Sequence, residues 1–261
     1  MDDTPPLLVE EADGIVVVRL NRPEARNTLS PPLIEALTRT AQDLRRRADV
    51  RAVILTGTGT LFSAGIDLKS DPDKDTLSER RVRALAGPDL CRAWEEIEAV
   101  AIVAIEGYCV GGACALALAC DFRVMGMSAM MRLPEVALGM NMSWGAVPRV
   151  TALLGPARAK RFIIEGAPTT AATCLAWGLA DEVVADGQAF EAAYAWASRV
   201  AALPPLPVRM TKQAVNACTT ALHSATAFMD RDQFLLTRTT DDLREGIEAF
   251  VQKRPATFRG D

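Results

Sequence analysis

The sequence predicts an α/β fold in which strands and helices alternate and pack in layers. Three short apolar runs rich in β-branched residues, at 15–20, 52–56 and 100–105, indicate buried strands. Segments with helical features lie between them, and from residue 143 onward the pattern is mostly helical. The 261 residues, 49% of them hydrophobic, are enough for one large domain with a substantial core.

The first strand, 15–20, ends at a turn over 21–23, where Asn-Arg-Pro interrupts the apolar run. Ser30 is a candidate N-cap, and Pro31 suits the first position of the helix that follows. This helix is expected to run to about residue 47. Its apolar positions fall on one face, formed by Leu33, Ile34, Leu37 and Leu44.

The second strand, 52–56, leads into a Gly-Thr-Gly turn at 57–59. The following segment, 70–77, is rich in Asp, Lys and Ser and is expected to be a loop. A single helix is expected over 78–98, and the third strand, 100–105, follows it.

Residues 112–119 are all small or apolar, which predicts a short helix that must be buried. A strand is expected over 122–125, and the segment 131–139 appears as irregular chain containing one acid. Helices are then expected over 143–154, 156–165, 170–177 and 187–202, with three more to the C-terminus.

Two glycine-containing motifs, Phe-Ser-Ala-Gly-Ile-Asp-Leu-Lys at 62–69 and Glu-Gly-Tyr-Cys-Val-Gly-Gly-Ala-Cys at 106–114, each follow a predicted strand. Glycine lets the backbone approach a ligand closely, and the second motif opens the apolar helix. The N-terminus of a helix carries unpaired N–H groups and a partial positive charge. Together the motifs can offer two N–H groups to one oxygen, which is the minimum for an oxyanion hole.

Composition excludes several classes of function. The net charge of −4 argues against a general nucleic-acid-binding protein, and no apolar run is long enough to span a membrane. The N-terminus lacks the features of a secretory signal, so a cytoplasmic protein is expected. The six cysteines form no CxxC pair, so reduced packing cysteines and no metal are expected. The only histidine, His223, lies far from the glycine motifs and is expected to be a surface or helix-packing residue.

Taken together, seven segments resemble the enoyl-CoA hydratase/isomerase (crotonase) family. They follow one another along nearly the whole chain, at 15–27, 62–69, 107–114, 133–135, 155–160, 176–181 and 245–254. The resemblance implies the crotonase fold, an α/β architecture in which ββα turns stack as a spiral. It implies a spiral core domain over 1–200 and a C-terminal helical region over 201–261 that mediates oligomerisation. A trimer, or a hexamer made of two trimers, is the expected assembly.

The resemblance also implies an acyl-CoA thioester as substrate, whose thioester oxygen would be bound by the N–H groups of Ile66 and Gly112. Coenzyme A would then be part of the substrate, and no separate cofactor is expected. Lys69 is a candidate for meeting the CoA phosphates. The substrate-binding residues implied by the resemblance are Ala25, Arg26, Ala64, Gly65, Asp67, Leu68, Lys69, Gly111, Phe234 and Lys253.

Two glutamates usually act in the hydratases of this family. One of them matches Glu135, whereas the position of the other is occupied by Ala115. Moving a double bond requires one carboxylate that removes a proton from one carbon and returns it to another, so Ala115 favours an enoyl-CoA isomerase with Glu135 as its acid and base. Glu135 as a mere surface acid is the competing interpretation.

Two further functions stay open. An enoyl-CoA hydratase would need Glu135 with water or with a substitute acid such as Asp67, Asp71 or Asp73. A non-catalytic acyl-CoA-binding protein would keep the fold without the chemistry. Trp144 stands where many relatives carry a small residue, so it either reshapes the acyl pocket or packs in the core. The arginine runs at 45–47 and 80–83 are interpreted as solvated helix faces.

Overall fold

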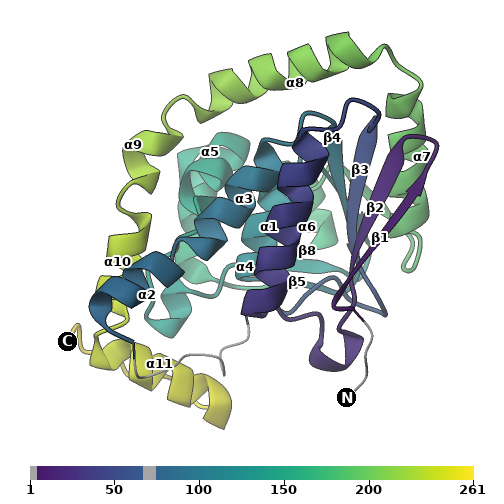
Figure 1. The fold of residues 1–261 in the computed structure, drawn as a ribbon. Helices are drawn as coiled ribbons and strands as arrows, with labels where there is room; N and C mark the ends of the chain where they lie inside the picture. Colours follow the sequence, from purple (N-terminus) through teal and green to yellow (C-terminus); the bar gives the residue numbers. More distant parts are fainter. Residues whose placement is uncertain (1–4, 67–74) are drawn as a thin grey trace.

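A six-stranded sheet forms the centre of the protein (Figure 1). The computed structural model describes residues 5–66 and 75–261. The strand β1 is antiparallel to β2, and every other neighbouring pair is parallel. In spatial order the strands are β1 (Leu7–Ala12), β2 (Ile15–Leu20), β3 (Ala52–Gly57), β4 (Val100–Ile105), β6 (Phe122–Gly126) and β9 (Glu182–Val184).

The strands β2, β3 and β4 are buried on both faces, which explains why their sequences are nearly continuous apolar runs and not alternating ones. In β3, Val53 and Leu55 join the larger core cluster, while Ala52 and Ile54 join a second cluster on the opposite face. The larger cluster contains residues of the helices α1 (Pro31–Arg45) and α3 (Ala86–Glu95), and the second contains residues of α7 (Ala189–Ala201). Figure 1 shows these helices on the two sides of the sheet.

A second sheet consists of three short strands. In it, β7 (Met130–Arg132) pairs with both β5 (Tyr108–Val110) and β8 (Thr169–Thr170). The helix α4 (Gly112–Ala119) follows β5 directly, and all eight of its residues are buried. The remaining helices of this part are α5 (Ala146–Glu165), which is interrupted at Gly155, and α6 (Ala171–Trp177).

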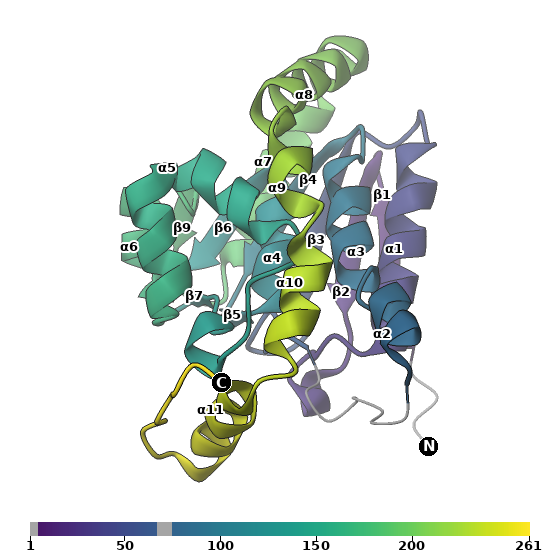
Figure 2. The same cartoon turned by 90° about the vertical axis from the view of Figure 1, so that its left-hand side faces the viewer.

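Four helices follow α7 in the described chain: α8 (Pro205–Thr220), α9 (His223–Ala227), α10 (Asp230–Thr237) and α11 (Asp241–Gln252). Both views show α8 crossing one end of the molecule and the chain then returning along α9 and α10 towards α2 (Leu77–Arg83) (Figures 1 and 2). Arg81 of α2 and Asp232 of α10 hold these two helices together through two hydrogen bonds of 2.6 and 2.9 Å.

Most of the expected elements are present, but the prediction of a single helix over 78–98 is wrong. The chain forms α2 and α3 instead, because Pro88 lacks an N–H and is tolerated only in the first turn of a helix. The strands β1, β5, β7, β8 and β9 were not expected, and the C-terminal part has four helices where three were expected. Among the described residues, no helix combines the length and the apolar composition that a membrane span requires.

Candidate active site

The buried side chain of Asn27 organises the turn after β2. Its Nδ2 donates to the carbonyl oxygens of Thr58 and Leu61 at 2.9 and 3.1 Å, and its Oδ1 accepts from the N–H of Arg22. The carbonyl of Asn27 accepts from the Ser63 hydroxyl at 2.7 Å. These bonds fasten the first turn to the segment that leads into the 62–69 motif.

The expected ligand-binding residues Ala25 and Arg26 lie in this turn, which the structure joins to the 62–69 motif. The Ala64 N–H donates to the Arg26 carbonyl at 3.1 Å. Ala25 ends the short helix η1 (Pro23–Ala25), and Arg26 has a positive φ of 53°. The structure therefore brings together two of the regions that the resemblance assigned to one binding surface.

The segment that leads to Ile66 is held by two isolated β-bridges to neighbouring segments. Ser63 pairs with Cys109, and Leu29 pairs with Ile66 in a parallel bridge. In that bridge the Leu29 N–H donates to the Gly65 carbonyl at 2.8 Å. Among the described residues the Ile66 N–H donates no backbone hydrogen bond in this pairing.

The two glycine motifs meet at the N-terminus of α4. A Cβ added to Gly65 would stand 2.6 Å from the Val110 carbonyl oxygen, so only glycine permits this approach. A Cβ added to Gly112 would stand 3.1 Å from Cγ1 of Ile66. Ile66 and Gly112, which the sequence predicted to act together, are therefore neighbours in space.

Glu135 lies beside this junction. A Cβ added to Gly111 would stand 3.0 Å from Oε1 of Glu135. The other carboxyl oxygen, Oε2, is buried and accepts no hydrogen bond from the described residues. Burial raises the pKa of Glu135 from 4.5 to about 7, and a hydrogen bond with its own backbone and the charge of Arg132 oppose this only in part. The interpretation of Glu135 as a mere surface acid is therefore wrong.

Ala115 is the fourth residue of α4 and is fully buried in the larger core cluster. Its N–H donates to the Gly111 carbonyl at 3.0 Å, as a regular helix requires. Position 115 therefore contributes a methyl group to the core and no proton-transferring group to the site.

A cavity of about 550 Å³ opens beside Ile66, within the range of about 300 to 1,000 Å³ that is typical of small-molecule sites. Much of its wall is apolar. Ile34 of α1, Leu235 of α10 and Ile247 of α11 line it, together with Leu29 and Met140 from connecting segments. Phe234 also lines this cavity, so the structure brings it to the site as the sequence predicted.

The indole of Trp144 lies between this cavity and the start of α4. A Cβ added to Gly112 would stand 2.8 Å from its ring, and one added to Gly87 would stand 2.0 Å from it. The ring therefore occupies space that would be filled by a side chain at either position if it were not glycine. Trp144 also has a positive φ of 63°, which is rare for a bulky residue. Arg149 donates to its carbonyl oxygen at 3.0 Å and helps to hold this conformation.

Arg80 and Arg83 of α2 line the same cavity. The interpretation of this arginine run as a solvated helix face is wrong for Arg80, which is only partly exposed and has a buried Nε. Arg81 points elsewhere and pairs with Asp232.

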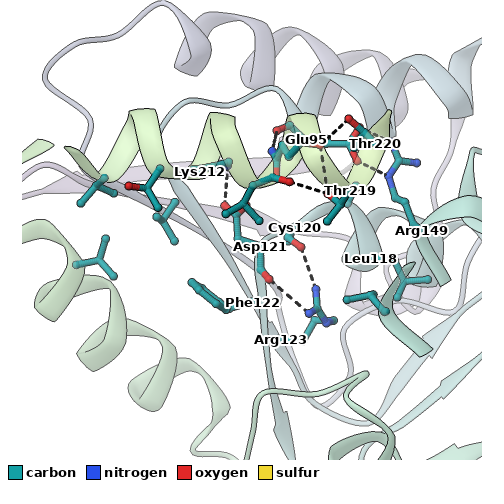
Figure 3. A pocket seen from close by; sticks show the side chains of 18 of the residues that line it. Glu95, Leu118, Cys120, Asp121, Phe122, Arg123, Arg149, Lys212, Thr219 and Thr220 are labelled. Carbon is teal, nitrogen blue, oxygen red and sulfur yellow. Dashed lines mark hydrogen bonds and ion pairs between the residues drawn. The ribbon is translucent and has the colours of Figure 1, made fainter. Parts of the chain in front are cut away.

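A larger cavity of about 710 Å³ lies under α8, away from the glycine motifs. Figure 3 shows the charged side chains in its wall, which are paired with one another or with backbone carbonyls. Lys212 binds Asp121 at 2.6 Å and the Ala99 carbonyl at 2.9 Å, and Arg149 makes two bonds with Glu95. His223 also lines this cavity, and burial lowers its pKa. The charged groups in its wall therefore largely neutralise one another, whereas Nε2 of His223 is buried and has no hydrogen-bond partner among the described residues.

Some of the predicted residues lie outside the described part of the chain, and Lys253 does not line the cavity. Asp67, Leu68 and Lys69 lie outside the described residues, as do the possible substitute acids Asp71 and Asp73. Lys253 follows α11 with an exposed side chain and is not among the residues that line the cavity beside Ile66. Among the described residues, no group of three or more His, Cys, Asp and Glu side chains could hold a metal ion.

Sequence reasoning missed three contributors to the site: Asn27, Ser63 and Arg80. Asn27 and Ser63 stand inside recognised motifs, and their small polar side chains, which readily bond to nearby backbone, were the available signal. Arg80 gave no such signal, because its place in the cavity depends on how α2 packs against α10.

Comparison with known proteins agrees with this geometry. The sequence model described as enoyl-CoA hydratase/isomerase matches residues 10–261. A 2,3-dehydroadipyl-CoA hydratase of Escherichia coli is 32% identical over 97% of this chain and 98% of its own. A short-chain-enoyl-CoA hydratase of Clostridium acetobutylicum is 30% identical over 95% of each chain.

Among solved structures, an enoyl-CoA hydratase from Mycobacterium avium subsp. paratuberculosis superposes with a TM-score of 0.88. It has 25% sequence identity and covers 98% of this chain and 99% of its own. The α/β crotonase fold predicted from the sequence is thereby confirmed. By its sequence over nearly its whole length and by its fold, the chain belongs to the enoyl-CoA hydratase/isomerase family of acyl-CoA-processing enzymes.

Proposed function

We propose that this enzyme moves the double bond of a 3-enoyl-CoA thioester into conjugation with the carbonyl, with Glu135 as the single acid and base. The N–H groups of Ile66 and Gly112 would bind the thioester oxygen. CoA enters with the substrate, so the proposed reaction needs no separate cofactor.

The proximity of Ile66 and Gly112 supports the proposed oxyanion hole. Removing a proton from Cα places negative charge on the thioester oxygen, and two fixed N–H donors stabilise that charge. Gly112 is the first residue of α4, whose N-terminus adds a partial positive charge of about half an elementary unit. Losing one such donor costs other enzymes about 3 to 4 kcal/mol of transition-state stabilisation.

In the proposed reaction the Glu135 carboxylate takes a proton from Cα, and the electron pair of the C–H bond moves into a dienolate. The same carboxyl then returns the proton to Cγ, and the double bond re-forms between Cα and Cβ. A pKa of about 7 suits both steps, because a group that titrates near the working pH both accepts and releases a proton readily.

One observation carries the preference for isomerisation. Glu135 lies next to Gly111 with a raised pKa, while position 115 holds a buried alanine. Hydration in the usual two-carboxylate arrangement needs a second group to complete the proton transfers, whereas isomerisation needs only the one.

Hydration is the second candidate, and the comparisons favour it. Two of the relatives are named as hydratases, one for 2,3-dehydroadipyl-CoA and one for short-chain enoyl-CoA. A hydratase built on this chain would have to orient the water with Glu135 and with a group other than the residue at position 115.

The products of the two reactions differ in mass, because hydration adds water to the thioester and isomerisation does not. The purified protein is incubated with a 3-enoyl-CoA and, separately, with a 2-enoyl-CoA, and products are followed by mass and by the absorbance of the conjugated thioester. Conjugation without a change in mass supports isomerisation, and gain of water supports hydration. The variant Glu135→Ala is expected to abolish either activity. Binding of both thioesters without turnover would instead indicate an acyl-CoA-binding protein.

A homotrimer, alone or as half of a hexamer, is also part of this proposal. The helix α8 exposes apolar side chains on the single chain, with Leu206 at 68%, Met210 at 67% and Val215 at 54% exposure. Exposed apolar side chains gathered on one element are typical of a surface that a partner covers. Light scattering on the purified protein would give its mass directly.

A further inference from the structure

The cavity beside Ile66 combines an apolar wall with several arginines, of which Arg83 forms an ion pair with Asp75. Four arginines line it, and the acids in its wall are Glu35 and Asp89. Glu35 is bound to Arg39 on the same helix, at 2.9 Å. The arginines are Arg39, Arg80, Arg83 and Arg238.

Among these arginines, Arg80 has a buried donor that lacks a hydrogen-bond partner in the described part of the chain. Its Nε is buried, and no described residue accepts a hydrogen bond from it. A buried donor without an acceptor costs about 1 to 3 kcal/mol, and more when the group is charged. A ligand oxygen in the cavity would remove that cost.

The two helices that carry the arginines are fixed relative to each other. Arg81 and Asp232 join α2 to α10 by a two-bond ion pair, and both views place these helices together (Figures 1 and 2). Arg238 directly follows α10, and its guanidinium lies 5.5 Å from the centre of the Phe234 ring. Partial burial lowers the pKa of Arg238. The positive charges are therefore held in place around the cavity.

We propose that this cavity takes an acyl group that ends in a carboxylate, and that Arg80 binds this carboxylate. The inference rests on the proposed function, since it assigns the cavity to the acyl group of the same thioester. Ile66 and Arg80 both line this one cavity. An acyl chain whose thioester oxygen is bound at Ile66 would thus cross the apolar wall and end among the guanidinium groups.

A carboxylate fits this environment better than a methyl end does. An arginine presents its N–H donors in a planar fork that matches the two oxygens of a carboxylate. A hydrocarbon end would leave the Arg80 Nε without an acceptor. The phosphates of CoA are the other possible anion, but Ala25 and Arg26, in the turn assigned to CoA, are not among the residues that line this cavity.

Binding of saturated thioesters tests the inference without any need for turnover. Hexanoyl-CoA and adipyl-CoA have the same chain length and differ in the terminal carboxylate, and free CoA reports on the phosphates alone. Titration calorimetry on the wild-type protein is expected to show adipyl-CoA binding about tenfold more tightly than hexanoyl-CoA. Arg80→Gln is expected to remove this preference and leave the affinity for hexanoyl-CoA and free CoA unchanged.

Arg92→Gln is the matched control, because Arg92 lies on the neighbouring helix α3 with an exposed side chain and is not among the cavity-lining residues. It should keep the preference for adipyl-CoA. Equal affinity of the wild type for the two thioesters would overturn the inference and leave the proposed function standing. An equal loss for all three ligands in Arg80→Gln would assign this arginine to the CoA phosphates and also overturn it. Failure of the wild type to bind either thioester would overturn both proposals.

Discussion

The carboxyl group of Glu135 lies directly against Gly111, so that a Cβ on Gly111 would stand 3.0 Å from Oε1. The glycine and the acid come from different sheet connections, since Gly111 follows β5 and Glu135 follows β7. They meet because these strands pair in parallel, with Val110 opposite Arg132, and the Gly111 N–H donates to the Arg132 carbonyl at 2.9 Å. The pairing of two short strands therefore sets the position of the proposed base relative to α4.

Gly111→Ala is expected to reduce kcat/KM by at least about tenfold, because the new methyl group pushes the Glu135 carboxyl out of place. The backbone at Gly111 has φ of 57°, so alanine there also costs about 1 kcal/mol or more of stability. Gly187→Ala is the control, since Gly187 has φ of 80° and nothing within 4 Å of an added Cβ. It should lose similar stability and keep its activity. Equal activity in the two variants would show that the close approach of Gly111 to the Glu135 carboxyl has no role in catalysis.

Glu135→Gln is expected to abolish isomerisation and to change how stability depends on pH. The pKa of Glu135 in the folded protein, about 7, lies above its ordinary value of 4.5. Between these values the folded state binds more protons than the unfolded state, so the wild type loses stability as pH rises, by about 3 kcal/mol in all. Glutamine does not titrate and should remove this loss.

Denaturant unfolding of both proteins at pH 5 and pH 8 measures the effect. The free energy of unfolding of Glu135→Gln, relative to wild type, should increase between the two pH values. A difference that is the same at both would show that the carboxyl is not held in an environment that opposes its charge.

The rate should depend on pH through the same group. The carboxylate form of Glu135 is the base, so kcat/KM is expected to rise with pH and to level off above about 7. A profile measured from pH 5 to pH 9 with a 3-enoyl-CoA tests this. A rise centred near pH 4.5 would mean that the carboxyl is solvated in the free enzyme.

The strands β2, β3 and β4 could be predicted because a strand buried on both faces has a continuous apolar sequence. The short strands β5 and β7 could not, since three residues with mixed burial give no periodicity. The glycine motifs located the site because close backbone approach excludes every other residue at Gly65. The role of Arg80 depends on contacts between α2 and α10, which are about 150 residues apart in sequence, and local pattern carries no such information.

Trp144 is expected to limit the acyl groups that the cavity accepts. Its ring lies against Gly112 and Gly87 and lines the cavity beside Ile66, so removing the ring joins its volume to the cavity. Trp144→Gly relieves the positive φ of 63° but loses the packing of a residue that is only 7% exposed, and a net loss of about 2 to 4 kcal/mol in stability is expected. The ratio of KM values for a long and a short 3-enoyl-CoA should fall in this variant, because the long chain gains space.

Trp177→Ala provides the comparison, since Trp177 ends α6 and does not belong to the wall of this cavity. It removes an indole elsewhere in the protein and should leave the KM ratio unchanged. If the ratio were the same in Trp144→Gly, wild type and Trp177→Ala, the indole of Trp144 would be core packing without influence on the acyl group. A fall confined to Trp144→Gly would instead make this side chain, together with the two glycines that admit it, the wall that sets acyl selectivity.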